Sequence, residues 1–532
     1  MTQPDGHQPP VKQPAVTLSG RTFSLFEVEQ VARRGLRVEI GGGAMEKIAA
    51  SEAALKALMA SRGAIYGVNT GFGSFSRTRI DADKLTEVQH NLIRSHAAGV
   101  GEPLAEDVVR AMLLLLAGSL SRGCSGVRAA VVETVVGMLN GGVTPVVPSV
   151  GSVGASGDLA PLAHCALVMI GEGEAKLRGE RMHGGEAMRR AGVRPLSLGP
   201  KEGLALINGT HLMAAQGALA MVDAERLIDA ALCACAMSID ACRGTDSFLD
   251  ERVYAARNQA GPRRAAVRLK QLLAGSEIIP SHAENDPRVQ DPYSLRCAPV
   301  VLGAVLDGFD HVRAIVEDEL GAVTDNPLVF AGEGIEATPP GGHRGIEGGK
   351  SEADVVSAGN FHGMPIAIPM DHLAILMCHV AGISERRVFH LLSASDPEMH
   401  LRPHLAPMPG LNSGLMIAQY TAAACVNEIA TLCMPASVVN IPTSAGMEDY
   451  NSFGPRSCAK ARRAVELATS VVAIELLCSA EAMEYHRPLK SGAGVEQALG
   501  VVREVVPRLT GDRPPAPDIE AVSRCIGEGR FL

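Results

Sequence analysis

The segment Gly151–His164 contains the residues of this chain that are best suited to chemistry. Within it, Ala155, Ser156 and Gly157 have what a backbone cyclisation requires. Gly157 lacks a Cβ atom, so its amide nitrogen can turn back onto the Ala155 carbonyl at low steric cost. Ser156 carries a β-hydroxyl that can leave as water and so produce an exocyclic methylene. The product would be an electrophilic ring, which enzymes otherwise obtain from a cofactor because no ordinary side chain is an electrophile.

Two other interpretations of this segment stay open on the residues alone. It can be a glycine loop that leads into a helix, with Asp158 as the N-cap and Pro161 in the first turn. Periodicity by itself favours this structural interpretation. A phosphate-binding loop is a further option, although the segment has neither the GxxxxGK[ST] nor the GxGxxG pattern.

The stretch Gly154–Ala163 resembles the signature of the aromatic amino acid ammonia-lyases and the related aminomutases. Their cofactor is 4-methylideneimidazole-5-one (MIO), which forms from Ala-Ser-Gly. Further motifs match the family in order between about residues 20 and 510: Tyr66–Gly73, Lys201–Leu206, Asn208–Thr210, Val289–Cys297, Thr324–Pro327, Gly359–Gly363, Ser384–Arg387 and Gly410–Gly414. The resemblance implies an MIO formed from Ala155, Ser156 and Gly157, and elimination of ammonia from an aromatic amino acid.

The resemblance also assigns roles to residues outside the tripeptide. Tyr66 is the base, and because a free phenol has a pKa of about 10, it needs a depressed pKa or a proton relay. Asn208 hydrogen-bonds the ring and stabilises negative charge on it, and Arg296 grips the substrate carboxylate with its planar guanidinium. Each has a structural alternative: a packed turn for Tyr66, a helix cap for Asn208 and an ion pair for Arg296. The other matching positions are catalytic Tyr293 and substrate-contacting Gln290, Asn326 and Phe361, of which Phe361 could equally be a core residue.

Two positions indicate the ring that the substrate carries. In this family the pair after the Asn91–Arg94 motif decides ring preference, and here the pair Ser95 and His96 resembles the histidine-specific members. Glu448 also resembles the histidine-specific members, and a carboxylate suits a substrate with an imidazole ring because it favours the charged form of that ring. The resemblance therefore implies conversion of L-histidine to trans-urocanate. Departures from the family pattern at His211, Val300, Met364, Met447 and Tyr450–Phe453 leave a modified histidine or another aryl amino acid, as in a tyrosine or phenylalanine lyase, open as substrate. Two further alternatives stay open independently of these departures: a 2,3-aminomutase, which shares every motif above, and an inactive helical scaffold.

Composition excludes several classes of protein and predicts a compartment. The net charge of −9 argues against nucleic acid or an anionic membrane surface as the main partner. The 12 cysteines include no CxxC pair and many lie in apolar runs, as in proteins of reducing compartments. The longest apolar run, Ala111–Leu120, is too short to span a bilayer. We therefore expect a cytoplasmic protein, and no metal site, since HExxH is absent and Pro403 separates His400 from His404.

The elements that must position these residues are predicted to be mainly helices. Aromatic residues make up only 3% and Trp is absent, so Ala, Leu, Val, Ile and 20 Met must pack the core. Apolar residues at Leu373, Leu376, Met377, Val380 and Ile383 have helical spacing, while Val16–Leu18 and Leu36–Ile40 are strand-like. We expect a mostly α protein, an elongated helical bundle with a smaller N-terminal α/β-like region, and a homotetramer by resemblance. The predicted segments are a disordered tail at 1–15, an N-terminal region with the inner loop and MIO at 16–202, a central helical bundle at 203–510 and a C-terminal tail at 511–532, with a loop at 331–350.

Overall fold

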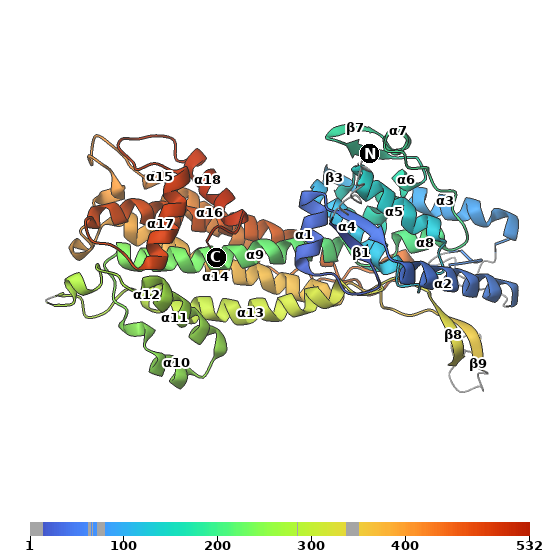
Figure 1. Cartoon of the computed structure of the whole chain (residues 1–532), viewed down its shortest axis with the longest axis horizontal. Helices are drawn as coiled ribbons and strands as arrows, with labels where there is room; N and C mark the ends of the chain where they lie inside the picture. Colours follow the sequence, from blue (N-terminus) through green and yellow to red (C-terminus); the bar gives the residue numbers. More distant parts are fainter. Residues whose placement is uncertain are drawn as a thin grey trace, which may run out of the picture. The chain divides into compact units, whose positions relative to one another are not determined.

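The structure, a computed structural model, describes residues 14–61, 65, 67–71, 80–284, 286–336 and 350–531. Tyr66 and most of the predicted tail lie outside these residues. The described part is mostly α-helical, which confirms the predicted fold class (Figure 1). It divides into two compact units, each made of three stretches of chain: Met1–Ala218, Glu317–Gly363 and Asn440–Pro455 in the first, and Leu219–Val316, Met364–Val439 and Arg456–Leu532 in the second. The boundaries at residues 15, 202 and 510 stay predictions.

The first unit begins with a strand–helix–strand element. Strand β1 (Ala15–Leu18) pairs in parallel with β2 (Arg37–Ile40), in agreement with the predicted strands. Helix α1 (Leu25–Arg34) joins them. It starts at a capping box between Ser24 and Glu27, which satisfies free N–H groups of the first turn.

The rest of the first unit is a layer of helices with three small antiparallel sheets. Its helices are α2 (Gly42–Ser61), α3 (Leu85–His96), α4 (Glu106–Leu120), α5 (Ala129–Gly141), α6 (Leu159–Met169), α7 (Gly184–Arg190) and α8 (Glu202–Ile207). The first sheet pairs β3 (Val100–Pro103) with β5 (Pro148–Val150). In the second, β6 (Glu174–Leu177) is the central strand between β4 (Val143–Pro145) and β7 (Glu180–His183). The third pairs β8 (Leu328–Glu336) with β9 (Lys350–Val356). The apolar run 111–120 is buried within α4. Both described ends of the predicted loop 331–350 belong to strands, because β8 and β9 pair across it.

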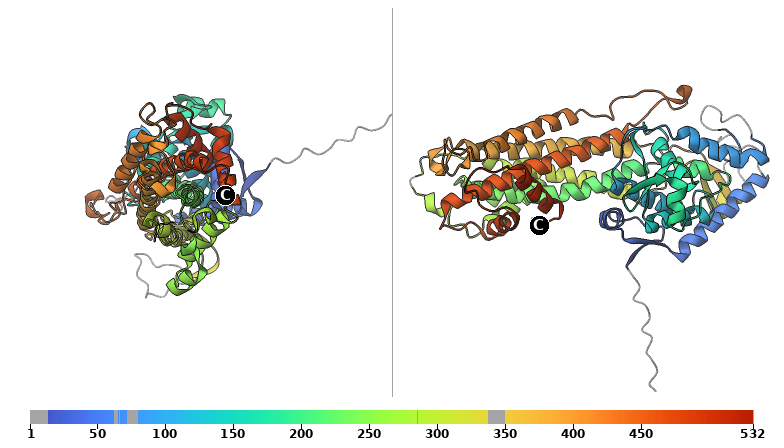
Figure 2. Two further views of the ribbon diagram at one scale, coloured as in Figure 1. Left: turned by 90° about the vertical axis from the view of Figure 1, so that its left-hand side faces the viewer. Right: turned by 90° about the horizontal axis from the view of Figure 1, so that it is seen from above.

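The second unit is a bundle of long helices that run side by side (Figure 1 and the right-hand view of Figure 2). Its elements are α9 (His211–Ala241) from Leu219 onward, α10 (Glu251–Arg257), α11 (Ala260–Leu273), α12 (Tyr293–Arg296), α13 (Ala298–Glu319) up to Val316, α14 (Met364–Ser393), α15 (Met416–Leu432), α16 (Gly454–Met483) from Arg456, α17 (Ala493–Val505) and α18 (Ala516–Gly527). The segment predicted as a C-terminal tail contains α18, which packs because Val522, Ile526 and the following Phe531 are buried.

A buried ion pair links helices of this bundle. The guanidinium of Arg387 on α14 donates to both carboxylate oxygens of Glu475 on α16, and Ser238 on α9 donates to the same carboxylate at 2.6 Å. Because both charges are buried, they must be paired to be tolerated. Helix α14 is long and apolar enough to cross a membrane, but 61% of its most apolar window is buried inside the protein, as in the core helix of a bundle.

Candidate active site

The tripeptide Ala155–Gly157 lies in the turn between β5 and α6 in the first unit. Its backbone is paired with the Asn208–Thr210 segment: Gly209 N–H donates to the Ser156 carbonyl at 3.2 Å, and Asp158 N–H donates to the Gly209 carbonyl at 2.7 Å. Gly157 has a φ of +73°, and a Cβ atom placed there would lie 2.1 Å from the Gly209 oxygen. Only glycine fits at this position, for both conformational and steric reasons.

Asp158 occupies the N-cap position of α6, but its side chain makes no capping bond to that helix. Its carboxylate instead accepts N–H bonds from Leu212 at 2.8 Å and Met213 at 3.1 Å, in the first turn of α9, and an O–H bond from Ser152 at 3.1 Å. Burial raises the pKa of Asp158 to about 7 in spite of these bonds. The predicted cap is therefore correct in position, but the carboxylate binds the first turn of α9 instead of α6.

A second segment holds the tripeptide turn from another side. Ser452 Oγ donates to the Gly154 carbonyl at 3.0 Å, and Phe453 N–H donates to the Val153 carbonyl at 2.9 Å. Ser452 is fully buried. The run Tyr450–Phe453, which departs from the family pattern, therefore contacts the backbone of the predicted reactive turn directly.

Asn208 lies at the end of α8 with one of its two polar atoms unpaired. Its Nδ2 donates to the Asn326 carbonyl at 3.0 Å, whereas its Oδ1 is buried and has no hydrogen-bond partner among the described residues. Asn326 is fixed in turn, because its Oδ1 accepts the Ala358 N–H at 2.8 Å. The preceding Asp325 forms a buried ion pair of 2.5 Å with Lys201. The amide of Asn208 is therefore held rigidly with an acceptor to spare.

His211 is a buried histidine with no polar partner. Neither of its ring nitrogens is hydrogen-bonded within the described part of the chain. Burial lowers its pKa to about 4, so the imidazole is neutral at neutral pH. Its ring lies against Gly209, where an added Cβ atom would come within 2.6 Å of the His211 Cε1 atom. The imidazole thus packs against the Gly209 backbone, which pairs with the tripeptide.

A cavity of about 630 Å³ opens beside the tripeptide, and several predicted site residues line it. Its walls are Ala155, Ser156, Asn326, Ser357, Ala358, Gly359, Phe361, His362, Met447, Glu448, Asp449 and Tyr450. Glu448 is half-buried, and its Oε2 accepts an O–H bond from Thr443 at 3.0 Å. Five of the predicted residues, Ala155, Ser156, Asn326, Phe361 and Glu448, are therefore brought together around one space large enough for an amino acid.

Ser95 and His96 do not line this cavity. They end α3, where His96 Nδ1 lies 2.8 Å from the Leu92 carbonyl. Because a carbonyl only accepts, Nδ1 is the donor of this bond. Ser95 Oγ donates to the same carbonyl at 3.0 Å. Their predicted contact with a substrate ring stays a prediction.

Gln290, Tyr293 and Arg296 form a separate cluster in the second unit. The Arg296 guanidinium donates to Gln290 Oε1 at 2.8 Å and to the Asp291 carbonyl at 2.9 Å, and it stacks over the Tyr293 ring at 4.5 Å. Tyr293 is 71% exposed. The predicted clamp is thus oriented by its neighbours and half-exposed, and it has no carboxylate partner within the described part of the chain.

Sequence reasoning missed some residues that line the cavity. His362 and Tyr450 stack at 6.3 Å between ring centroids, and His362 Nε2 donates to the Tyr450 carbonyl at 2.9 Å. His362 lies next to the predicted Phe361, so the Gly359–Gly363 motif could have indicated it. Tyr450 and Met447 depart from the family pattern, but only the fold shows that they line the cavity.

Comparison with known proteins identifies the family. The aromatic amino acid lyase model matches residues 23–504. The chain belongs to this family. A histidine ammonia-lyase of Anaeromyxobacter dehalogenans is 47% identical over 96% of this chain and 98% of its own length. The crystal structure of histidine ammonia-lyase from Trypanosoma cruzi has a TM-score of 0.86 and 38% identity, covering 97% of this chain and 94% of that one. Tyrosine aminomutase from Streptomyces globisporus has a TM-score of 0.87 and 32% identity, covering 98% of both chains.

The residues of this aromatic amino acid lyase fit the MIO that the family uses. The fit rests on two observations: Gly157 has no room for a side chain, and Ala155 and Ser156 line the cavity.

Proposed function

We propose that this aromatic amino acid lyase eliminates ammonia from L-histidine and releases trans-urocanate. The observation that carries the proposal is the shared cavity of Ser156 and Glu448. It joins the serine that can become an electrophile to a carboxylate that can hydrogen-bond an imidazole. The high identity to proteins named histidine ammonia-lyase supports the same substrate.

The cofactor in this proposal is MIO, made autocatalytically from Ala155, Ser156 and Gly157. The Gly157 nitrogen forms a bond to the Ala155 carbonyl carbon, that carbonyl oxygen leaves as water, and the Ser156 hydroxyl leaves as a second water. Once formed, MIO supplies the electrophile that makes ammonia a better leaving group. In this proposal the Nδ2 donor of Asn208 stabilises negative charge on the ring; in this structure that group donates to the Asn326 carbonyl.

The chain's own side chains bind the substrate and move the proton. Glu448 accepts an N–H bond from the imidazole, and His96 offers its Nε2 to the same ring. Arg296, with Gln290 and Tyr293 beside it, binds the substrate carboxylate. Phe361 packs against the ring, and Tyr66 takes the β-proton.

The proposal includes a homotetramer in the cytoplasm, with no nucleic acid, membrane or metal ion as partner. Large apolar side chains are exposed on α15 and after it in the second unit: Ile417, Tyr420, Met434, Val438 and Val439. Exposed apolar residues in such number are typical of a protein–protein interface. The free thiols of all 12 cysteines suit a reducing compartment.

The test of this function is a product panel. The purified protein is incubated with histidine, phenylalanine, tyrosine and histidines methylated on the ring, and the arylacrylate is detected by its ultraviolet absorbance. We expect histidine to have the highest kcat/KM. Formation of a β-amino acid would identify an aminomutase, and a better tyrosine or phenylalanine substrate would overturn the histidine assignment.

The cofactor is tested separately by mass. The intact protein is expected to weigh less than its sequence by two water molecules, with the loss mapped to the peptide that contains Ala155–Gly157. Ser156→Ala lacks the leaving hydroxyl. The variant should therefore not show the loss of the water that this hydroxyl forms, and it should have no turnover. Ser149→Ala, an exposed serine on β5, is the matched control. Retained turnover in Ser156→Ala would contradict the MIO assignment.

A further inference from the structure

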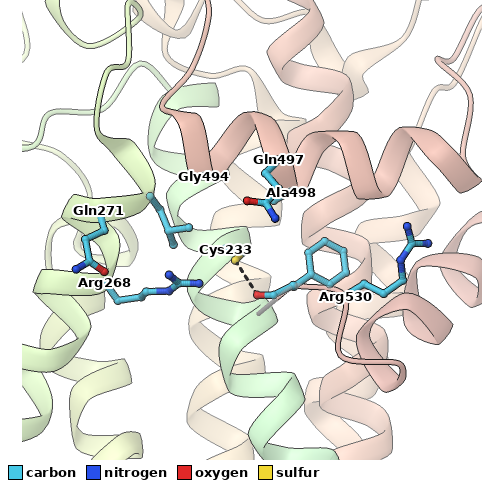
Figure 3. Close-up of a pocket in the computed structure, with 9 residues that line it drawn as sticks. Cys233, Arg268, Gln271, Gly494, Gln497, Ala498 and Arg530 are labelled. Carbon is cyan, nitrogen blue, oxygen red and sulfur yellow. Dashed lines mark hydrogen bonds between the residues drawn. The ribbon is translucent and has the colours of Figure 1, made fainter.

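A second cavity, of about 110 Å³, lies within the second unit (Figure 3). Helices α9, α11 and α17 and the residues after α18 surround it. Its lining residues are Cys233, Arg268, Gln271, Leu272, Gly494, Gln497, Ala498, Arg530 and Phe531. None of them belongs to the motifs that carry the lyase function.

The polar groups around this cavity are mostly hydrogen-bond donors, and no carboxylate is among the lining residues. Figure 3 shows Arg268 extending from α11 into the space, with the Gln497 carboxamide approaching from α17. Gln271 lies beside Arg268 at the rim. Such a set of one guanidinium and two carboxamides favours an acceptor-rich, negatively charged guest.

The two arginines differ in the acidic groups near them. Arg530 extends away from the cavity and forms an ion pair with Glu504. No carboxylate lines the cavity beside Arg268. Burial raises the pKa of Asp229, which the charge of Arg268 lowers, but Asp229 is not among the lining residues. The guanidinium of Arg268 therefore faces the cavity with no acidic side chain in the cavity wall.

The remaining walls neither neutralise Arg268 nor repel an anion. The Cys233 thiol donates to the Phe531 carbonyl at 3.3 Å, and burial raises the pKa of this thiol to about 11, so it stays uncharged. Leu272, Ala498 and the Phe531 ring supply an apolar floor. Desolvation by these apolar walls strengthens a hydrogen-bonded charge pair.

We propose that this cavity is a binding site for a small oxyanion, a phosphate or a short carboxylate, held by Arg268 with Gln271 and Gln497 at its rim. The size agrees, because a cavity of about 150 Å³ accommodates benzene and one of this volume takes a ligand of a few heavy atoms. A guanidinium fork binds either anion in a bidentate way. The site joins α11 to α17, so its ligand stabilises the packing of the second unit.

The test measures the melting temperature of the full chain, and its heat of binding, with sodium phosphate or sodium acetate against sodium chloride at equal ionic strength. A ligand that binds only the folded state raises stability with its concentration, so we expect a saturable increase in melting temperature with at least one oxyanion. The two salts separate phosphate from carboxylate ligands. Arg268→Gln should lose the increase, while Arg263→Gln, an exposed arginine on the same helix, should keep it.

Three further variants test whether the anion is held by Arg268 in this cavity and nowhere else. Gln497→Glu places a carboxylate at the rim and should abolish binding by occupying Arg268, without removing any arginine. Arg296→Gln should bind normally, which separates this site from the proposed substrate clamp. A chain extended by Gly-Ser after Leu532 moves the terminal carboxylate two residues further along the chain. This variant should bind the anion as wild type does. Equal shifts in Arg268→Gln and wild type, or a shift that appears only in the extended chain, would overturn the proposal.

Discussion

Asp158 follows the Ala155–Gly157 tripeptide, and its carboxylate accepts the backbone N–H of Leu212 at 2.8 Å. One residue thereby fixes the tripeptide turn to the first turn of α9, while its own N–H binds the Gly209 carbonyl. A helix N-terminus stabilises negative charge, but complete burial opposes it, and the pKa of Asp158 rises to about 7. The junction between tripeptide and helix is therefore sensitive to pH.

Asp158→Asn is expected to change how stability depends on pH. Because the folded pKa is above the unfolded value of 3.8, the folded state binds more protons between these values, and this group loses stability as pH rises from about 4 to 7. Between about pH 5 and pH 8 the titration of Asp158 should lower the free energy of unfolding of wild type by roughly 2–3 kcal/mol. This decrease should be absent in Asp158→Asn. Urea unfolding at both pH values measures it, with the exposed Asp83→Asn as control. Parallel pH profiles for Asp158→Asn and wild type would contradict the burial of this charge.

His211→Gln should show the opposite pH dependence. The pKa of His211 is about 4 in the fold and about 6.5 in the unfolded chain, so the unfolded state binds more protons in this range and acid destabilises the protein. Removing the imidazole should raise the free energy of unfolding by about 2 kcal/mol at about pH 5 and by much less at pH 8. The comparison is with His379→Gln, an exposed histidine on α14. An equal effect at both pH values would show that packing, and not titration, is responsible.

Gly157→Ala should destabilise the first unit and prevent cyclisation. The new Cβ atom would lie 2.1 Å from the Gly209 oxygen at a φ of +73°, so the turn must open. Gly142→Ala isolates the backbone strain, since Gly142 has a φ of +72° and nothing within 4 Å of an added Cβ. We expect a cost of roughly 1 kcal/mol for Gly142→Ala and a larger one for Gly157→Ala. Thermal unfolding measures the loss of stability, and intact mass measures cyclisation. The steric argument would be refuted if both variants lost the same stability and Gly157→Ala still lost two water molecules.

Glu448→Gln should weaken the reaction with histidine while leaving the fold intact. The amide keeps the shape and the bond from Thr443 but loses the charge, and a hydrogen bond to a charged group contributes about 1.5–3 kcal/mol. We therefore expect kcat/KM for histidine to fall roughly 10- to 100-fold. The neighbouring Asp449→Asn, also in the cavity wall, provides the comparison and should change it by only a few fold. An unaltered kcat/KM in Glu448→Gln would remove Glu448 from substrate recognition.

The fold class was predictable because its cause is local. Alanine and leucine favour helices, and the stripe from Leu373 to Ile383 gives one apolar face, most of which is buried in α14. The C-terminal segment 511–532 was predicted as a tail, but it contains helix α18. Its burial depends on helices far away in the sequence, which supply the surface for Val522 and Phe531.

The sequence by itself determined the chemistry: three adjacent small residues can cyclise, and ordered motifs identify the family. Only the tertiary structure decided what surrounds them. It placed Glu448 beside Ser156 across nearly three hundred residues of chain, gave Asp158 a partner on another helix, and left His211 and the Oδ1 of Asn208 without partners among the described residues. Residue type and short-range spacing fix what a segment can do, whereas burial and hydrogen-bond partners come from segments that are distant in sequence and meet only when the core is packed.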